Sequence, residues 1–190
     1  MGGYPLHDTE PMDRGSAAGE PQSPNPEPLA AWRFRLAMLR HERLVYRVAL
    51  SLLRNRADAE DVTQETFMQY WQRGDGVTGP REWLLRVARN ASLDRLRTAA
   101  RRGDGNAAEV PALPDERDPA WHYRQHELGA TLERLIGDLP EPQRSLVVLF
   151  DVHGVSGRAC ARILDLNPNQ VKVYLHRARR RLRLELEPLR

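Results

Sequence analysis

The sequence predicts an all-α fold in which two small helical domains are joined by a flexible acidic linker. Apolar residues recur at helical spacing in two long parts of the chain. Between these parts, residues 103–120 contain five acidic residues, one basic residue, three prolines and two glycines. Such a segment buries too little apolar surface to fold alone. The predicted organisation is a disordered tail over residues 1–28, a first domain over 29–102, a linker over 103–125 and a second domain over 126–190.

The charge of the chain is unevenly distributed. Its 190 residues carry a formal net charge of +3, but residues 1–30 hold five acidic residues against one arginine, and residues 169–190 hold seven basic residues against two glutamates. A basic end beside acidic segments is typical of a protein that binds a polyanion. No apolar run approaches 18 residues, and the start lacks a basic and then apolar signal pattern. We therefore expect a cytoplasmic protein without a membrane span.

The first helical region begins near Ala31. Its apolar residues lie close to helical spacing and predict either one core helix or two, the second alternative having a break near His41–Glu42. These core residues are Trp32, Leu36, Leu39, Leu44, Val45, Val48 and Leu52.

The next predicted helix, Asp58–Gln72, has an apolar side and an acidic side. The apolar side, which we expect to be buried, contains Ala59, Val62, Phe67, Tyr70 and Trp71. The opposite side contains Asp58, Asp61, Gln64, Glu65 and Met68. It is either a docking patch for a basic partner or a solvated acidic face. Without a nearby His, Cys or glycine loop, these carboxylates predict neither catalysis nor metal binding.

A glycine-rich loop, Arg73–Pro80, leads into an amphipathic helix over Pro80–Arg102. Glycines allow a backbone to approach a ligand closely, although a plain connector has the same composition. The inner half of the helix contains Leu84, Leu85, Val87, Ala88, Ala91 and Leu96. Its outer arc contains Arg86, Arg89, Asn90, Arg97 and Arg101, with Trp83 and Asp94 at the edges. Arginines beside an aromatic ring are typical of a surface that follows a nucleic-acid strand, whereas Trp83 taken alone is more simply a core residue.

In the second domain, residues 155–186 fit two helices separated by a tight turn. Ser156 is the expected N-cap of the first helix, and Asn167 followed by Pro168 is the expected start of the second. A preceding helix, from Leu139-Pro140 to Gly154, should pack beneath them through Leu146, Leu149 and Phe150.

The second of these two helices has a buried side and a basic side. We expect burial of Val171, Tyr174, Leu175, Ala178 and Leu182. The opposite side carries Asn169, Lys172, Val173, His176, Arg177, Arg180 and Arg183. These groups can contact phosphates and base edges in a major groove, as in DNA-binding helix-turn-helix domains. The alternative is a solvated basic face on a bundle helix.

The sequence predicts no catalytic site, metal site or cofactor. The single cysteine, Cys160, excludes an intramolecular disulfide, lies at an apolar helix position and has no paired base nearby. His122 and His126 are spaced for a metal on one helix face, but neither a third ligand nor a general-base glutamate between them accompanies the pair. The chain also contains no phosphate-binding loop.

Four segments follow one another in a recognisable order. They are D-A-E-D-V-T-Q-E-T-F-M-Q-Y-W (Asp58–Trp71), W-L-L-R-V-A-R-N-A-S-L-D-R-L-R (Trp83–Arg97), L-P-E-P-Q-R (Leu139–Arg144) and V-K-V-Y-L-H-R-A-R-R-R-L-R (Val171–Arg183). These segments resemble conserved parts of the sigma-70 family of bacterial RNA polymerase initiation factors. The first two are similar to its region 2.2 helix and its region 2.3–2.4 helix. The last two are similar to the start of its region 4 and to its region 4.2 recognition helix. The length and two-domain layout resemble its extracytoplasmic-function (ECF, group 4) branch.

Three departures from the family lie in the helix-turn-helix. Where the family usually has Glu-Ile-Ala in the first helix, this chain has Ala159-Cys160-Ala161, and the usual glycine before the turn is Asp165. The usual Gly-Thr before Val171 is Asn169-Gln170. These departures bear on the −35 sequence preference rather than on the way the domain docks.

The resemblance implies a partner for each polar surface. Core RNA polymerase would bind Asp58, Asp61, Gln64, Glu65 and Met68 through its β′ clamp helices and β subunit. The −10 element would contact Trp83, Arg86, Asn90, Asp94 and Arg97. One of its bases would be flipped into a pocket at the glycine-rich loop. The −35 element would meet Asn169, Lys172, Val173, His176, Arg177 and Arg180. The linker would run toward the active-centre and RNA-exit channels, and an anti-sigma factor would cover both domains.

The predicted function is that of an alternative sigma factor without catalysis of its own, which binds core RNA polymerase, recognises −35 and −10 elements and directs promoter melting. The alternative is a free-standing helix-turn-helix transcriptional regulator. Such a regulator needs a dimer interface to bind paired half-sites, and the sequence has no spare apolar helix for one. It also leaves the acidic side of Asp58–Trp71 unexplained.

Overall fold

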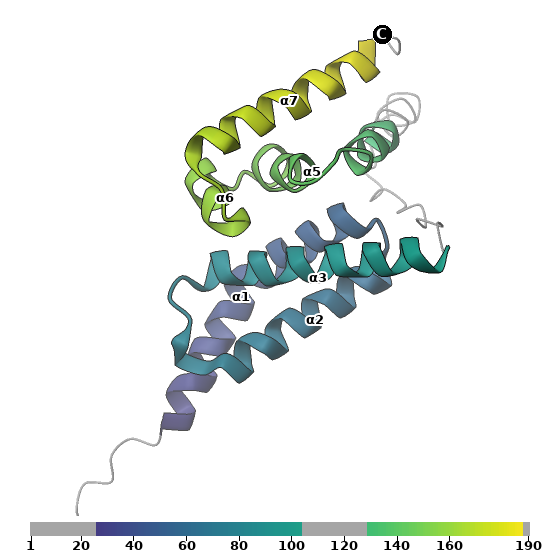
Figure 1. Ribbon diagram of the computed structural model, residues 1–190. Coiled ribbons are helices and arrows are strands. Elements are labelled where there is room, and N and C mark those ends of the chain that lie inside the picture. The colour runs from purple at the N-terminus through teal and green to yellow at the C-terminus, as the bar shows by residue number, and fades with distance from the viewer. Residues whose placement is uncertain (1–25, 104–128, 188–190) are drawn as a thin grey trace, which may run out of the picture.

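The structure, a computed structural model, describes residues 26–103 and 129–187, and within these ranges it consists of helices and turns without a strand (Figure 1). The predicted all-α class with two helical domains is confirmed. The predicted tail up to residue 25, the linker from residue 104 onward and the pair His122 and His126 lie outside the described residues.

The first domain contains three long helices. They are α1 (Pro26–Leu53), α2 (Arg56–Arg73) and α3 (Pro80–Arg102), with a short 3-10 turn, η1 (Gly74–Gly76), between α2 and α3. Asn55 caps α2, since its Oδ1 accepts a hydrogen bond from the backbone N–H of Asp58 at 3.1 Å. Pro80 occupies the first turn of α3. A backbone N–H at this position has no acceptor within the helix, so proline, which lacks one, is tolerated there.

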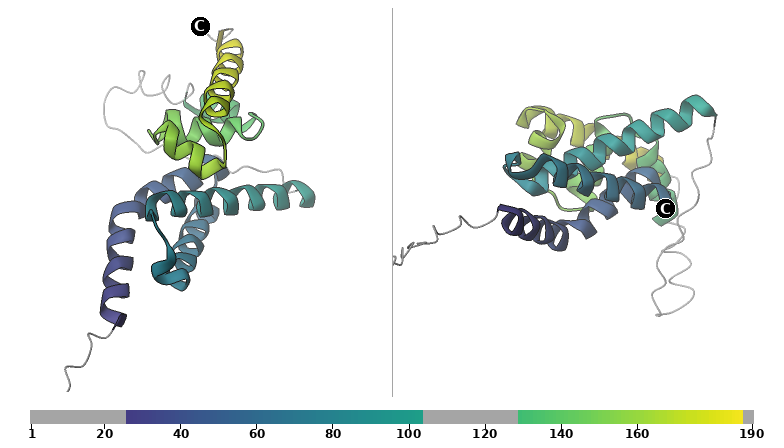
Figure 2. Two further views of the ribbon diagram at one scale, coloured as in Figure 1. Left: turned by 60° about the vertical axis from the view of Figure 1, so that its left-hand side comes forward. Right: turned by 90° about the horizontal axis from the view of Figure 1, so that it is seen from below.

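α1 is one continuous helix, so the single-helix alternative is confirmed and the alternative with a break near His41–Glu42 is wrong. It begins at Pro26, ahead of the predicted domain start at residue 29. The first turns of α1 extend past the ends of the other helices (Figure 2). Trp32 is therefore 60% exposed, and Leu39, farther along, is 86% exposed. Both were predicted as core residues, but helical spacing marks an apolar stripe without showing that another element covers it.

The core of the first domain lies where α1, α2 and α3 meet. Burial of one large apolar side chain contributes about 1.5–3 kcal/mol to folding, and the fully buried ones include Val45, Val48, Val62, Leu84 and Leu85. This three-helix contact therefore fixes which side of each helix faces outward.

Aromatic rings close one end of this core. Phe34 of α1 lies edge-on to Trp71 of α2, with 5.1 Å between ring centroids, and Tyr70 lies 5.8 Å from Trp83 of α3. Trp83 is half-buried, which fits a packing role. Trp71 is 52% exposed, so its predicted burial is wrong: the ring packs at the edge of the core rather than inside it.

The second domain contains a helical segment over residues 129–137 and four further elements. They are α5 (Gln143–Leu146), η2 (Val147–Val152), α6 (Gly157–Leu164) and α7 (Pro168–Leu186). The backbone widens to π-helical spacing in η2. The rod formed by α5 and η2 begins at Gln143 rather than at Leu139-Pro140. Leu146 and Leu149 are buried beneath α6 and α7 as predicted, and Phe150 is half-buried.

Both predicted caps of the helix-turn-helix are confirmed. The Oγ of Ser156 accepts a hydrogen bond from the N–H of Ala159 at 3.3 Å. At the start of α7, Asn167 and Gln170 each accept a hydrogen bond from the other's backbone N–H at 2.8 Å, which is a capping box. Asp165, where the family usually has glycine, takes the left-handed conformation with a φ of 55°, which aspartate tolerates better than most residues.

The two domains pack directly against each other. α3 contacts α6, and α1 contacts η2. Figures 1 and 2 show the second domain seated over α3 and the C-terminal part of α1, with α7 on the side farthest from the first domain. The basic helix therefore lies away from the contact between the domains.

The capping box allows a direct test of the turn. We expect Asn167→Ala to lower the free energy of unfolding by about 1 kcal/mol, because the N–H of Gln170 loses its acceptor. Denaturant titration followed by circular dichroism measures the change. Asn169→Ala is the matched control, because Asn169 is exposed in the same helical turn and makes no cap bond. Equal stability of the two variants would contradict the capping role.

Candidate nucleic-acid interface

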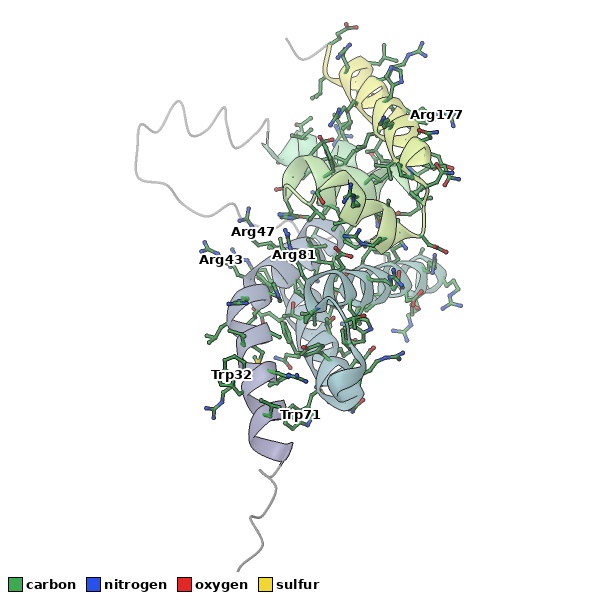
Figure 3. All side chains as sticks on the ribbon, turned by 90° about the vertical axis from the view of Figure 1, so that its left-hand side faces the viewer. Trp32, Arg43, Arg47, Trp71, Arg81 and Arg177 are labelled. Atoms are coloured by element: carbon green, nitrogen blue, oxygen red, sulfur yellow. The ribbon has the colours of Figure 1, made fainter. Side chains whose placement is uncertain are left out.

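α7 presents the two faces that its sequence predicts. Val171, Leu175 and Ala178 are buried, and Tyr174 and Leu182 are half-buried. The residues predicted for the opposite side are all exposed: Asn169, Lys172, Val173, His176, Arg177, Arg180 and Arg183. Figure 3 shows Arg177 projecting outward from α7. The predicted −35 residues therefore share one open, basic face.

Arg179 has a different role from its neighbours on α7. Its guanidinium pairs with the carboxylate of Asp151 in η2, with Nε 3.2 Å from Oδ2, and lies 5.6 Å from the ring centroid of Phe150. Together these contacts hold α7 at a set position on η2, so Arg179 supports the basic face rather than extending it.

The acidic side of α2 is joined to α3 by one arginine. Nη1 of Arg95 lies 3.2 Å from a carboxylate oxygen of Asp58 and 3.2 Å from one of Asp61, and its Nη2 lies 3.5 Å from Glu65. Gln64 and Met68 are exposed beside them. The predicted clustering of the carboxylates is therefore present. Arg95 escaped prediction because the spacing within one helix does not show which residue of another helix faces it.

The outer face of α3 divides into an open half and a covered half. In the open half, Arg97 pairs with Asp94 at 2.7 Å, and both side chains are exposed. In the covered half, Arg86 remains exposed but donates a hydrogen bond to the backbone carbonyl of Arg162 in α6. The side chain of Arg89 is only 17% exposed. Of the residues predicted to contact the −10 element, Trp83 is half-buried and the others, Arg86, Asn90, Asp94 and Arg97, are exposed.

Arg89 is the polar centre of this covered half. Its Nε donates to the hydroxyl of Ser145 at 2.9 Å, and its Nη2 pairs with the carboxylate of Glu141 at 3.0 Å. Ser145 in turn donates to the same carboxylate at 2.6 Å. The prediction placed Arg89 on an outer arc, and the second domain covers it there.

Two further contacts join the domains. Arg162 of α6 forms a two-pronged ion pair with Glu82 of α3. The hydroxyl of Ser51 lies 3.0 Å from Nε2 of His153. Burial, assisted by the charge of Arg47 at the junction of the domains (Figure 3), lowers the pKa of His153 to about 4. The imidazole is therefore neutral at pH 7.

The glycine-rich loop borders a pocket of about 500 Å³ between itself, α1 and α2. Phe34, Tyr70 and Trp71 supply aromatic walls, and Gly74 and Pro80 come from the loop side. Gly74 and Gly79 have φ values of 59° and 78°, in the region that favours glycine. The loop thus has both the backbone freedom and the neighbouring hollow that capture of a planar group requires.

Two kinds of site are absent from the part of the chain that the structure describes. Residues 26–103 and 129–187 hold no group of three His, Cys, Asp or Glu side chains placed to bind a metal ion. Among the same residues, no helix is both long and apolar enough to cross a membrane.

The capped turn and the open basic face of α7, on an all-α scaffold, define a DNA-binding protein of the helix-turn-helix class. The comparisons identify the family. The model described as Sigma-70 region 2 matches residues 37–102, and the model described as Sigma-70, region 4 matches residues 130–182. The chain belongs to the sigma-70 family of RNA polymerase sigma factors, in its ECF branch.

Relatives agree with this assignment. The chain is 35% identical over 153 residues to the ECF RNA polymerase sigma factor SigE of Mycolicibacterium smegmatis, a match that spans 75% of this chain and 57% of that protein. It is 33% identical over 158 residues to the ECF RNA polymerase sigma factor SigL of Mycobacterium tuberculosis, spanning 78% of this chain and 86% of that one.

Solved structures share the fold. CnrH in complex with the cytosolic domain of CnrY matches with a TM-score of 0.61 at 25% identity, covering 83% of this chain and 90% of that chain. The sigma factor RpoE in complex with the anti-sigma factor NepR from Bartonella quintana matches with a TM-score of 0.59 at 22% identity, covering 82% and 98%.

Cys160 should be inert in the native protein. Its side chain is fully buried, and burial raises the pKa of the thiol to about 11. We expect native Cys160 to react with a disulfide reagent at pH 8 at least about a hundredfold more slowly than the same residue in denaturant, because the reactive species is the thiolate. Stopped-flow absorbance measures both rates. Similar rates would show that the first helix of the helix-turn-helix is not packed as described.

Proposed function

We propose that this protein is an alternative sigma factor that binds core RNA polymerase, recognises −35 and −10 promoter elements and directs promoter melting and transcription initiation. The observation that carries the proposal is the presence, in one chain of this family, of a capped helix-turn-helix with a basic face and a separate domain with an acidic face. A protein that only binds DNA has no use for the second of these surfaces.

The open face of α7 supports binding to the −35 element. Lys172 and Arg177 offer charged donors to phosphates and guanine edges, and Asn169 matches the donor and acceptor pattern of adenine. Val173 is 46% exposed, and its methyl groups suit contact with a thymine methyl. Insertion of α7 in the major groove brings these side chains to the bases together.

The acidic side of α2 supports docking on core polymerase. Asp61 and Glu65 are exposed and carry two of the three charges that Arg95 gathers. Since one arginine balances only one carboxylate, the face keeps a net negative charge and would attract a basic partner surface. Met68, beside them and 61% exposed, adds a flexible apolar contact of the kind found in interfaces.

The outer face of α3 and the glycine-rich loop support engagement of the −10 element. Arg97 and Asn90 are exposed and can follow the strand. The 500 Å³ pocket beside Trp71 and Gly74 suits a base flipped from the stack. Unstacking costs a few kcal/mol, which stacking on the aromatic walls and phosphate contacts would offset.

The partners and place of action follow from this function. The protein would act without catalysis of its own, in the cytoplasm where promoter DNA and polymerase meet. Two structural neighbours were solved with a bound partner, the cytosolic domain of CnrY in one and the anti-sigma factor NepR in the other. An anti-sigma factor is therefore a proposed partner of this protein as well.

Run-off transcription tests the function through the acidic side of α2. With core polymerase and genomic fragments that include the protein's own upstream region, we expect discrete start sites that appear only when the protein is added. Asp61→Asn combined with Glu65→Gln should weaken core binding at least about tenfold and reduce the run-off product, because two charges of the docking face are lost. Fluorescence anisotropy with labelled protein measures the core affinity.

The control is Glu133→Gln combined with Glu185→Gln, which removes the same net charge from exposed positions of the second domain. It should transcribe like the unmodified protein. A sequence-specific shift of duplex DNA without polymerase, together with no stimulation of run-off, would overturn the proposal in favour of a conventional regulator.

The −35 contact has its own test on the promoter found in this way. Arg177→Ala should lower holoenzyme affinity for the promoter by roughly 5- to 150-fold, as expected for the loss of a base-contacting arginine. When the −35 element is scrambled, the variant and the unmodified protein should bind equally. Arg134→Ala makes the same charge change on an exposed residue outside α7. An equal loss on both templates would show that Arg177 contacts phosphate rather than a base, and no loss on either would show that it does not contact the promoter.

A further inference from the structure

We propose that Arg95 is a positioning residue for the acidic side of α2: it holds the carboxylates of Asp58, Asp61 and Glu65 in the arrangement that docks on core polymerase. Its loss therefore weakens docking, although the loss makes this surface more negative. The inference rests on the proposed function, because it concerns the surface assigned there to core polymerase. It adds to that surface a residue from a different helix, α3.

The three carboxylates do not order one another. Asp61 follows Asp58 by three positions and Glu65 follows Asp61 by four, which places all three along one side of α2. Like charges at this spacing repel each other, and the three side chains are 46%, 62% and 54% exposed in chain order. On α2 alone each side chain would turn away from its neighbours into solvent. A fixed arrangement needs a group that attracts all three.

Arg95 supplies that group from α3. Its Nη1 lies 3.2 Å from oxygens of both Asp58 and Asp61, and its Nη2 lies 3.5 Å from Glu65. The donors of a guanidinium are held in one rigid plane, so three carboxylates bound to it take set positions relative to one another. A lysine ammonium is a point charge on a flexible stem and offers no such plane. The contact therefore defines the geometry of this surface as well as part of its charge.

The position of Arg95 is itself set by packing. Its side chain is 29% exposed, and of its neighbours in α3, Leu93 is buried and Leu96 packs against the core. Burial alone would lower the pKa of Arg95, but the hydrogen bond to Asp61 and the charges of Glu65 and Asp61 raise this pKa overall. The guanidinium therefore stays charged, and it attracts the carboxylates to a place that the core holds fixed.

Arg95 has two opposite effects on the binding of a basic partner. Its positive charge cancels one of three negative charges and reduces the attraction, but distance and salt weaken this effect at an exposed surface. Its contacts also order three side chains before the partner arrives, and side chains that are ordered in advance lose less freedom on binding. The ordering acts on three groups, whereas the charge acts once. We therefore expect the ordering to dominate the affinity.

The affinity and the kinetics of core binding separate the two effects. We expect Arg95→Gln to lower the affinity of the full chain for core polymerase roughly fivefold or more, as measured by fluorescence anisotropy. Stopped-flow mixing should show association that is no slower, because the surface is more negative. Dissociation should be faster, because the carboxylates are then ordered only after the encounter. Arg95→Lys keeps the charge without the rigid plane and should show a smaller loss of affinity.

Two controls isolate the positioning role. Arg35→Gln removes the same charge from an exposed position of α1 in the same domain, and it should dissociate from core polymerase like the unmodified protein. The second control is the background of Asp61→Asn with Glu65→Gln, in which two of the three carboxylates are gone. There Arg95→Gln should change the core affinity less than about twofold, whereas a purely structural role would lower the affinity equally in both backgrounds.

The order of the carboxylates can be measured without polymerase. Carbon-13 relaxation of the side-chain carboxyl carbons in the free protein reports the motion of each group. We expect Arg95→Gln to increase the motion of Asp61 and Glu65. The carboxyl group of Glu133, an exposed residue of the second domain, should move as in the unmodified protein.

Three results would overturn the inference. Equal or tighter core binding by Arg95→Gln would show that the charge of Arg95 dominates, an equal loss in both backgrounds would assign it a structural role, and unchanged carboxylate motion would show that it does not order them. Each leaves the proposed function intact as long as Asp61→Asn with Glu65→Gln weakens core binding. No effect of that pair would instead overturn the docking surface itself, and with it the role of Arg95.

Discussion

Each helix of this protein has one apolar side, and the burial of that side decides which polar groups stay available to partners. Packing of Val171, Leu175 and Ala178 turns Lys172 and Arg177 outward on α7. The same requirement turns the carboxylates of α2 outward. Apolar burial yields about 25 cal/mol per Å², so one large side chain outweighs an exposed ion pair. The positions of the charged faces therefore follow from packing rather than from attraction between charges.

α3 is the exception, because it packs on two sides. Leu84 and Leu85 belong to the core of the first domain, while Arg86 and Arg89 on the opposite side meet the second domain. A charged group is costly to cover unless it is paired, and this explains why a carboxylate, Glu141, lies opposite Arg89. An interface of paired polar groups can exchange its partners for water or for another polar surface, as an apolar core cannot.

The charged surfaces of the two domains are kept apart. The carboxylates of α2 are gathered by Arg95 at one place, whereas the basic residues of α7 lie on the side of the second domain farthest from the first. This separation prevents the two faces from neutralising each other within the chain. It also lets a basic protein surface and a DNA duplex each be attracted to its own end of the molecule.

Local chemistry in the sequence determined the helices, the caps at Ser156 and Asn167 and the two faces of α7, because periodicity and capping involve residues only three or four positions apart. It also carried the family resemblance. The exposure of Trp32 and Trp71, the partner of Arg95 and the covering of Arg89 were decided only by the tertiary structure. Each of these depends on which surface of a helix distant in the sequence lies opposite the residue. The spacing of residues within one helix does not determine that surface.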